Sequence, residues 1–120
     1  MGDRDASLSR SERLRKRKEF LGVYANGERF HTHYFVLYLL ENHRLNHRLG
    51  VTVSRKIGGA VVRNRVRRHL REVFRKNKAN IPVPCDVVFN AKRAASLASY
   101  EELVSGFLFS VERWIRKREG

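Results

Sequence analysis

The stretch 60–77 combines residue types and a spacing that suit the binding of a polyanion. It contains seven cations and one acid, and arginine outnumbers lysine six to one. Arg67, Arg71 and Arg75 follow one another at four-residue spacing, which stacks like charges on one side of a helix and destabilises that helix in isolation. A solvated helix face normally mixes charges of both signs. Planar guanidinium groups suit two-point contacts with phosphate, so the pattern favours a polyanion-binding face over a merely solvated one.

Three aromatic residues, Phe20, Tyr24 and Tyr38, form a second candidate group because cations lie near them. Proteins hold single-stranded nucleic acids by stacking bases on aromatic rings while Lys and Arg follow the phosphates. Packing in a hydrophobic core is the alternative for each ring, and the residues alone leave both interpretations open. The cations of this group are Arg15, Lys16, Arg17, Lys18, Arg55, Lys56, Lys92 and Arg93.

Candidate catalytic and metal-binding residues are scarce. The acids are scattered, and no close carboxylate set suggests a two-metal nuclease. His31 and His33 would share a face of a strand and could bind a metal, but the sequence offers no clear further ligand to complete the site. Gly58 and Gly59 precede a helix, where a phosphate could bind, although the full Walker spacing is absent. We therefore expect neither a catalytic residue nor a metal ligand in this chain.

The overall charge agrees with a polyanionic partner. The 120 residues carry 26 Lys and Arg against 12 Asp and Glu, a formal net charge of +14. A compact domain with that excess repels itself unless a polyanion neutralises it, and nucleic acid is the usual one. The longest apolar run, 34–40, is far shorter than the ~20 residues of a membrane-spanning helix. Cys85 is the only cysteine, which excludes an internal disulfide and predicts a cytoplasmic protein.

Hydrophobic periodicity predicts the elements that position these groups. We expect a flexible basic arm over residues 1–12 and a single domain over 13–118. Within the domain, the pattern predicts helices at 18–26 and 60–77, and a last helix that begins after Ser99 with Glu102 completing a capping box. It predicts strands at 34–41, 48–54 and 86–91, and more weakly at 28–31. The order α-β-β-β-α-β-α indicates an α+β sandwich with one mixed sheet, and general rules predict a right-handed crossover through the long helix.

At this point the sequence resembles a known family. The stretch 54–68, SRKIGGAVVRNRVRR, is similar to the signature of the bacterial ribonuclease P protein component, in which an Arg-Asn-Arg helix follows a Lys-x-Gly-x-Ala-Val segment. Residues 13–27, 35–38 and 86–93 also resemble the family's first helix, second strand, and fourth strand with its basic exit. The resemblance covers nearly the whole chain.

The resemblance implies a fold and a function. The fold is similar to the second domain of ribosomal protein S5 and has a left-handed βαβ crossover, contrary to the general rule. The implied partners are the catalytic ribonuclease P RNA, with one protein per RNA subunit, and precursor tRNA; neither DNA nor a membrane is expected. That RNA, with bound Mg²⁺, removes the 5′ leader of precursor tRNA. The chain would then be a non-catalytic subunit of this endoribonuclease.

The resemblance also implies two sets of site residues. A surface for the RNA subunit would comprise Arg63, Asn64, Arg65, Arg67, Arg68 and Arg71. A surface for the precursor-tRNA leader would comprise Phe20, Tyr24, Tyr38, Arg55, Lys56, Lys92 and Arg93.

Three other functions have similar charge or size. A ribosomal protein or RNA chaperone would need no aromatic surface and would show no preference for leaders. A protein-only nuclease would cleave RNA without an RNA cofactor and depend on a histidine. A DNA-binding helix-turn-helix module needs two adjacent helices, and the strand-rich order argues against it.

Overall fold

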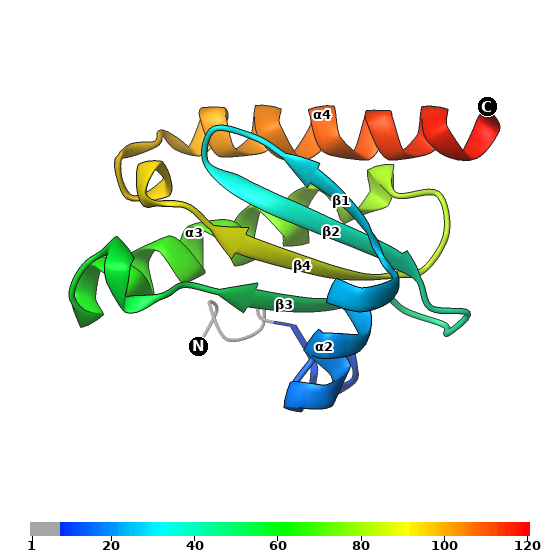
Figure 1. Cartoon of the computed structure of the whole chain (residues 1–120), viewed down its shortest axis with the longest axis horizontal. Helices are drawn as coiled ribbons and strands as arrows, with labels where there is room; N and C mark the ends of the chain where they lie inside the picture. The colour runs from blue at the N-terminus through cyan, green and yellow to red at the C-terminus, as the bar shows by residue number, and fades with distance from the viewer. Residues whose placement is uncertain (1–7) are drawn as a thin grey trace.

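The computed structural model describes residues 8–120, which form the α-β-β-β-α-β-α order predicted from the sequence (Figure 1). Short 3₁₀ helices connect several of the elements: η1 (Arg10–Glu12), η2 (Arg55–Ile57), η3 (Lys78–Asn80) and η4 (Arg93–Leu97). The helices are α2 (Arg17–Asn26), α3 (Ala60–Asn77) and α4 (Tyr100–Glu119), and the strands are β1 (Glu28–His31), β2 (Phe35–Glu41), β3 (Arg48–Thr52) and β4 (Cys85–Ala91). No helix within this described range is both long enough and apolar enough to cross a membrane.

The four strands form one mixed sheet in the order β1-β2-β4-β3. β4 lies between β2, to which it is antiparallel, and β3, to which it is parallel. In Figure 1, β3 and β4 point the same way and α3 runs behind the sheet; with the strands turned upward, β4 lies to the right of β3. A connection that moves to the right behind the sheet is left-handed. The general expectation of a right-handed crossover is therefore wrong here, and the handedness implied by the family resemblance is correct.

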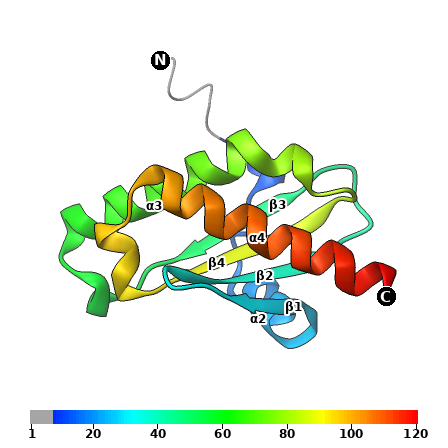
Figure 2. The same ribbon diagram turned by 90° about the horizontal axis from the view of Figure 1, so that it is seen from above.

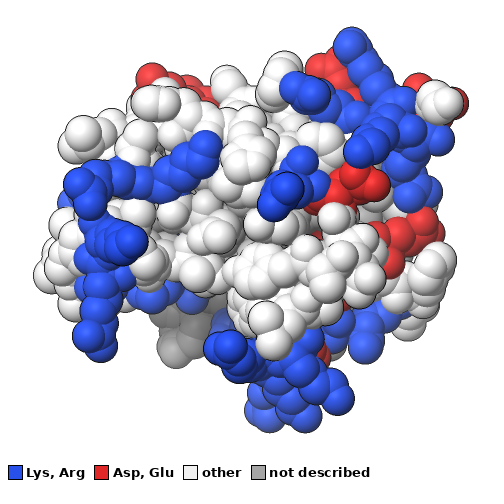
Figure 3. Space-filling model, in the orientation of Figure 1, with Lys and Arg blue, Asp and Glu red and all other residues white. Residues whose placement is uncertain are grey.

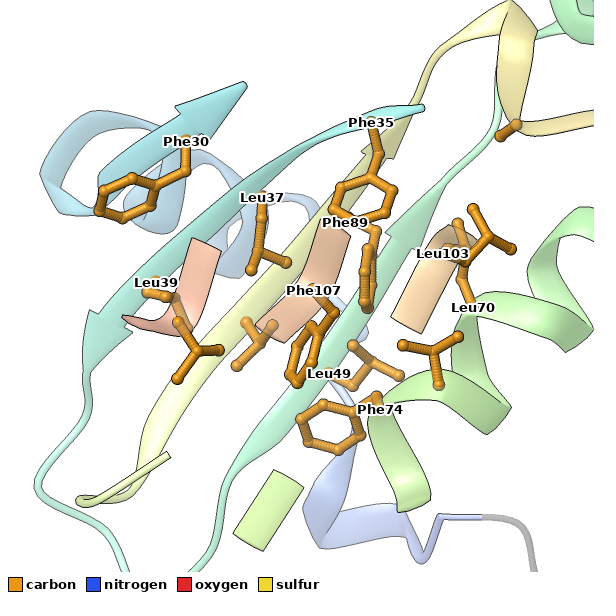
Figure 4. Close-up of a cluster of buried hydrophobic side chains, with 14 of the residues drawn as sticks. Phe30, Phe35, Leu37, Leu39, Leu49, Leu70, Phe74, Phe89, Leu103 and Phe107 are labelled. Atoms are coloured by element: carbon orange, nitrogen blue, oxygen red, sulfur yellow. The ribbon is translucent and has the colours of Figure 1, made fainter. Parts of the chain in front are cut away.

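Two helices cover one face of the sheet and one helix covers part of the other. α3 and α4 lie on the same side, and α2 lies on the opposite side (Figures 1 and 2). Strand alternation sends Phe35, Leu37 and Leu39 of β2 toward α3 and α4, where all three are fully buried. They meet the inner faces of both helices in the main core, seen in Figure 4, which includes Leu70, Phe74, Phe89, Leu103 and Phe107.

The helix boundaries follow local signals. α3 begins after Gly59 as predicted, because Gly58 adopts φ +157°, a conformation that side chains disfavour, and a Cβ there would come within 3.1 Å of Val62. α4 begins after Ser99, whose hydroxyl accepts the Glu102 N–H while the Glu102 carboxylate accepts the Ser99 N–H, the predicted capping box.

The N-terminal boundary differs from the expectation. Residues 1–7 of the expected arm lie outside the described residues. Leu8 is buried in the main core, and its carbonyl accepts a hydrogen bond from Arg13 Nε at 3.1 Å. Because apolar burial holds this segment, the packed part of the chain includes Leu8 and extends before residue 13. The third strand also ends at Thr52 instead of Ser54, since Ser54 precedes the 3₁₀ turn η2.

Candidate nucleic-acid interface

The outward side of α3 carries most of the predicted cations. We call the set Arg63, Asn64, Arg65, Arg67, Arg68 and Arg71 the α3 basic face. The opposite side of α3 is apolar and is buried in the core through Val66, Leu70, Val73 and Phe74. Helical periodicity therefore turns the arginines away from the sheet. Within residues 8–120, no arginine of this face is in an ion pair with an acid. The side chains instead reach backbone and amide oxygens: Arg63 to Gly58 O at 2.8 Å, Arg65 to Ser96 O at 3.3 Å, and Arg67 to Asn64 Oδ1 at 3.0 Å.

Burial and neighbouring cations together disfavour the charged form of two side chains on α3. Desolvation, followed by the positive charges of Arg13 and Arg67, lowers the pKa of Arg71 from its ordinary value. The pKa of His69 on the same helix is also lowered, by burial and then by Arg68 and Arg65. The α3 basic face ends at Glu72, which forms ion pairs with Arg75 and Lys76. Arg75, which the sequence pattern grouped with the free cations, is therefore neutralised within the helix.

A second basic group lies where the parallel strands β3 and β4 end. Arg55 and Lys56 lie in η2 after β3, while Lys92 and Arg93 follow β4; we call these four residues the basic end. η2, η4 and the first part of α3 contact one another, so the basic end adjoins the α3 basic face. Lys92 Nζ donates to Thr32 O at 2.6 Å, and Arg55, Lys56 and Arg93 are exposed. Figure 3 shows Lys and Arg side chains at this end of the molecule, on the left.

Cations at the other end of the molecule differ because acids neutralise them. Lys117 pairs with Glu28 at 2.7 Å, and Arg118 pairs with Glu41 at 3.1 Å. Arg116 pairs with Glu112 one helical turn earlier. By contrast, the sequence contains no Asp or Glu between Glu41 and Glu72, the stretch that supplies β3, η2 and most of α3. Unpaired positive charge is therefore found around α3 and at the ends of β3 and β4. It is also found at the start of α2, where Arg15, Lys16, Arg17 and Lys18 are exposed.

The three predicted aromatics meet between α2 and the sheet. The Tyr24 and Tyr38 rings lie 4.8 Å apart, centroid to centroid, in an edge-to-face arrangement. The Tyr24 hydroxyl is 3.2 Å from Thr52 Oγ1. Phe20, Tyr24 and Tyr38 pack against a small second cluster of Leu14, Val23 and Val88, yet each remains partly exposed. Each ring is therefore partly core and partly surface: one part supports α2, and the other faces solvent.

Strand register adds residues that the sequence did not single out. Asn90 of β4 lies between Val36 of β2 and Thr52 of β3, one pleat beyond the Tyr38, Val88 and Gly50 row under α2. We call Phe20, Tyr24, Tyr38, Val36, Thr52 and Asn90 the aromatic surface. It reaches toward the end of β4, after which Lys92 and Arg93 follow. Alternation within β2 placed Val36 and Tyr38 on one face, but only the pairing of distant strands could place Asn90 beside them.

Metal-ligand geometry is absent from the described part of the chain: no three His, Cys, Asp or Glu side chains in residues 8–120 are grouped so as to hold a metal ion. His31 and His33 do not share a strand face, because β1 ends at His31 and His33 lies in the following turn. The His33 ring instead packs edge-to-face on Tyr34 with centroids 4.9 Å apart. The donor groups of residues 8–120 therefore do not fit Mg²⁺.

The sequence also did not predict an ion network at the start of α2. Arg48 of β3 donates two hydrogen bonds to Asp86 of β4, at 2.8 and 2.7 Å, and a third to Glu19 of α2 at 3.1 Å. The partners are separated by 38 and 29 residues, so no local sequence signal could have revealed the network.

A small α+β domain that combines an unpaired arginine face with partly exposed aromatic rings has the features of a polyanion-binding protein. Comparison with known proteins specifies the family. The sequence model of the family Ribonuclease P matches residues 8–116. The chain is 40% identical to the ribonuclease P protein component of Desulfovibrio desulfuricans over 117 residues, 94% of this chain and 90% of that one. It is 42% identical to the one of Syntrophus aciditrophicus, over 81% of this chain and 82% of the relative.

Solved structures agree with the sequence comparison. The ribonuclease P protein from Thermotoga maritima superimposes with a TM-score of 0.75 at 34% identity, over 85% of this chain and 96% of that chain. The Staphylococcus aureus protein gives a TM-score of 0.73 at 30% identity, over 87% and 94%. The chain belongs to the bacterial ribonuclease P protein family. It is thus a protein component of an endoribonuclease that is a ribonucleoprotein, and the family implies a role in processing the 5′ leader of precursor tRNA.

Proposed function

We propose that the α3 basic face binds the catalytic ribonuclease P RNA and that the aromatic surface, with the basic end, holds the 5′ leader of precursor tRNA. The observation that carries the proposal is the presence of two different surfaces on opposite faces of the sheet, with the basic end at the ends of the strands between them. One is a helix face whose arginines have no acidic partner among the described residues. The other is a partly exposed set of rings whose neighbours Thr52 and Asn90 lie near the ends of β3 and β4, after which Arg55, Lys56, Lys92 and Arg93 follow.

The two surfaces suit different forms of RNA. Arginine forks on a rigid helix can contact successive phosphates of a folded RNA, and each contact releases a condensed counterion. Partly exposed rings suit an unpaired strand, whose bases can stack while flanking cations follow its backbone. A 5′ leader is single-stranded and is present only in the precursor, so binding it would let the protein favour precursor over mature tRNA.

In this proposal the chemistry belongs to the RNA. The described residues offer no donor cluster for Mg²⁺, so we assign the magnesium ions and the cleavage step to the RNA subunit. The protein's task is to bind and orient two RNAs, with one protein per RNA subunit. DNA and membranes are not expected partners.

A reconstitution tests the proposal. Precursor tRNA labelled at its 5′ end is incubated at low magnesium with the protein alone, with a bacterial ribonuclease P RNA alone, and with both. We expect cleavage at the mature 5′ end only when both are present, and a higher affinity of the complex for precursor than for mature tRNA.

The other outcomes are distinct. Cleavage by the protein alone, after removal of contaminating nuclease, would place catalysis in the chain. Stimulation without a preference for the precursor would support RNA-subunit binding and contradict the assignment of the leader to the aromatic surface.

A further inference from the structure

The start of α2 is held by a carboxylate with two functions. Glu19 Oε1 accepts the backbone N–H groups of Arg15 at 2.8 Å and Lys16 at 3.0 Å, which caps the helix. Its second oxygen, Oε2, accepts a hydrogen bond from Arg48 Nη1 at 3.1 Å. The Glu19 side chain thus both caps the N-terminus of α2 and joins the helix to the sheet.

Arg48 can be a precise anchor because Asp86 holds its guanidinium in place. The two residues lie opposite each other in the parallel β3–β4 register, and the guanidinium meets both oxygens of the buried Asp86 carboxylate. Asn42 Nδ2 donates to the same carboxylate at 2.9 Å. A planar fork that is fixed at two points has little rotational freedom left, so its third donor has a defined direction, and that direction is toward Glu19.

This anchor lies directly beside the aromatic surface. Phe20 follows Glu19 in the chain, and Tyr24 lies one helical turn beyond Phe20 on the same side of α2. Beyond this anchor, α2 contacts the sheet through one polar pair, the Tyr24 hydroxyl and Thr52 Oγ1 at 3.2 Å, and through apolar residues such as Val23, whose packing is non-directional. The Glu19–Arg48 hydrogen bond therefore supplies a directional constraint on how far α2 and its rings stand from the sheet.

We propose that Arg48, held by Asp86, acts through Glu19 as a positioning residue that sets the place of α2 for leader binding. The inference rests on the proposed function, because it assumes that the leader lies on the aromatic surface. Arg48 is 13% exposed and Glu19 is 26% exposed at the side chain, so neither needs to touch RNA in order to act.

Two variants test the constraint without removing the fold. Glu19→Gln keeps the cap, since glutamine also serves in a capping box, but it removes the charge that faces Arg48. Arg48→Lys keeps a cation opposite Asp86 but lacks the third donor of the fork. The matched control is Glu112→Gln, the same chemical change in an exposed ion pair on α4, away from both surfaces.

The measurements use the reconstituted complex of protein and RNA subunit. For Glu19→Gln and Arg48→Lys we expect the ratio of precursor to mature tRNA affinity to fall by about two- to fivefold, the effect of one partly exposed ion pair. The KM for precursor should rise with kcat unchanged, while mature-tRNA affinity, RNA-subunit affinity and melting temperature stay near those of Glu112→Gln. A merely structural role would lower the melting temperature without changing the ratio.

Phe20→Ala separates failure of this inference from failure of the proposed function. If Phe20→Ala lowers the precursor preference and the two network variants do not, α2 needs no such constraint and the inference is wrong. If Phe20→Ala also leaves the preference unchanged, the leader is not bound on the aromatic surface, and the positioning role of Arg48 is overturned with it.

Discussion

The Phe20 ring lies directly over Gly50, and a Cβ built on Gly50 would come within 2.5 Å of the ring's Cε2 atom. Because Gly50 has no Cβ, the Phe20 ring can pack against the backbone of β3 at this position.

Replacing Gly50 with alanine should displace this ring. We expect Gly50→Ala to lower the free energy of unfolding by about 1–3 kcal/mol through overpacking, and to weaken precursor binding because Phe20 must move. Gly22→Ala is the control within α2, where a Cβ meets nothing within 4 Å. That change should stabilise the protein by about 0.5–1 kcal/mol. Chemical denaturation of both variants measures the difference; equal stabilities would mean that the ring moves aside at no cost.

The exposed part of Tyr38 should contribute to precursor binding. We expect Tyr38→Ala to weaken the affinity of the reconstituted complex for precursor tRNA by about 1–3 kcal/mol, the range for one lost base–aromatic stack, and to change mature-tRNA affinity less. Tyr38→Phe keeps the ring and should retain most of the affinity. Equal losses on both substrates would contradict the leader assignment.

The α3 basic face should differ from the paired cations of α4. We expect Arg65→Ala to weaken assembly with the RNA subunit and to reduce the slope of log affinity against log salt by about one unit for each lost phosphate contact. Arg116→Ala removes the same charge from a residue that is paired with Glu112, and it should change the slope little. Filter binding over a salt series measures both slopes, and indistinguishable slopes would show that only net charge matters.

His47 should make the fold sensitive to mild acid. Its Nδ1 accepts the Cys85 N–H at 3.0 Å, and burial, followed by the charge of Lys78, lowers its pKa from the ordinary 6.5. A histidine with a lowered pKa in the folded state binds its proton more readily when unfolded. The free energy of unfolding should therefore be highest above pH 6.5 and fall as the pH drops through the folded-state pKa.

The substitution His47→Gln tests this contribution. In this variant the free energy of unfolding should decrease less than in the wild type as the pH falls below 6.5. His69, whose pKa is also lowered, should account for part of the decrease that remains. His43→Gln makes the same change at an exposed histidine in the β2–β3 turn and is the control. If His47→Gln and His43→Gln give the same pH profile, proton binding at His47 is not linked to folding.

The sequence predicted those parts of the fold that local signals determine. The 60–77 helix has its apolar stripe and a glycine pair before it, and its bounds agree with α3. Ser99 and Glu102 marked the start of α4. β1 was only weakly indicated, because two of its four residues are exposed and only one side chain, Phe30, is buried. It forms because β2 supplies hydrogen-bonding partners along its whole length.

Features that depend on distant pairing could not be read locally. Nothing in residues 86–91 shows that this strand lies between β2 and β3, since the order follows from how α3 crosses the sheet. The same holds for Asn90, which joins the aromatic surface through register, and for Arg48, whose partners come from two other elements. The scarcity of acids in 60–77 predicted that the arginines of α3 would be unpaired. The pairing of Arg75 with Glu72 was not predicted, because it depends on side-chain rotamers that the spacing alone does not determine.

The pairing of Lys117 and Arg118 with Glu28 and Glu41 has a kinetic consequence. These acids neutralise cations at the C-terminal end of α4, whereas the α3 basic face and the basic end have no acidic partner among the described residues. The molecule therefore has an electric dipole moment in addition to its net charge. A highly charged RNA would exert a torque on that dipole during diffusion and turn the α3 side forward before contact. Such steering raises the fraction of productive encounters, an effect that falls steeply with ionic strength.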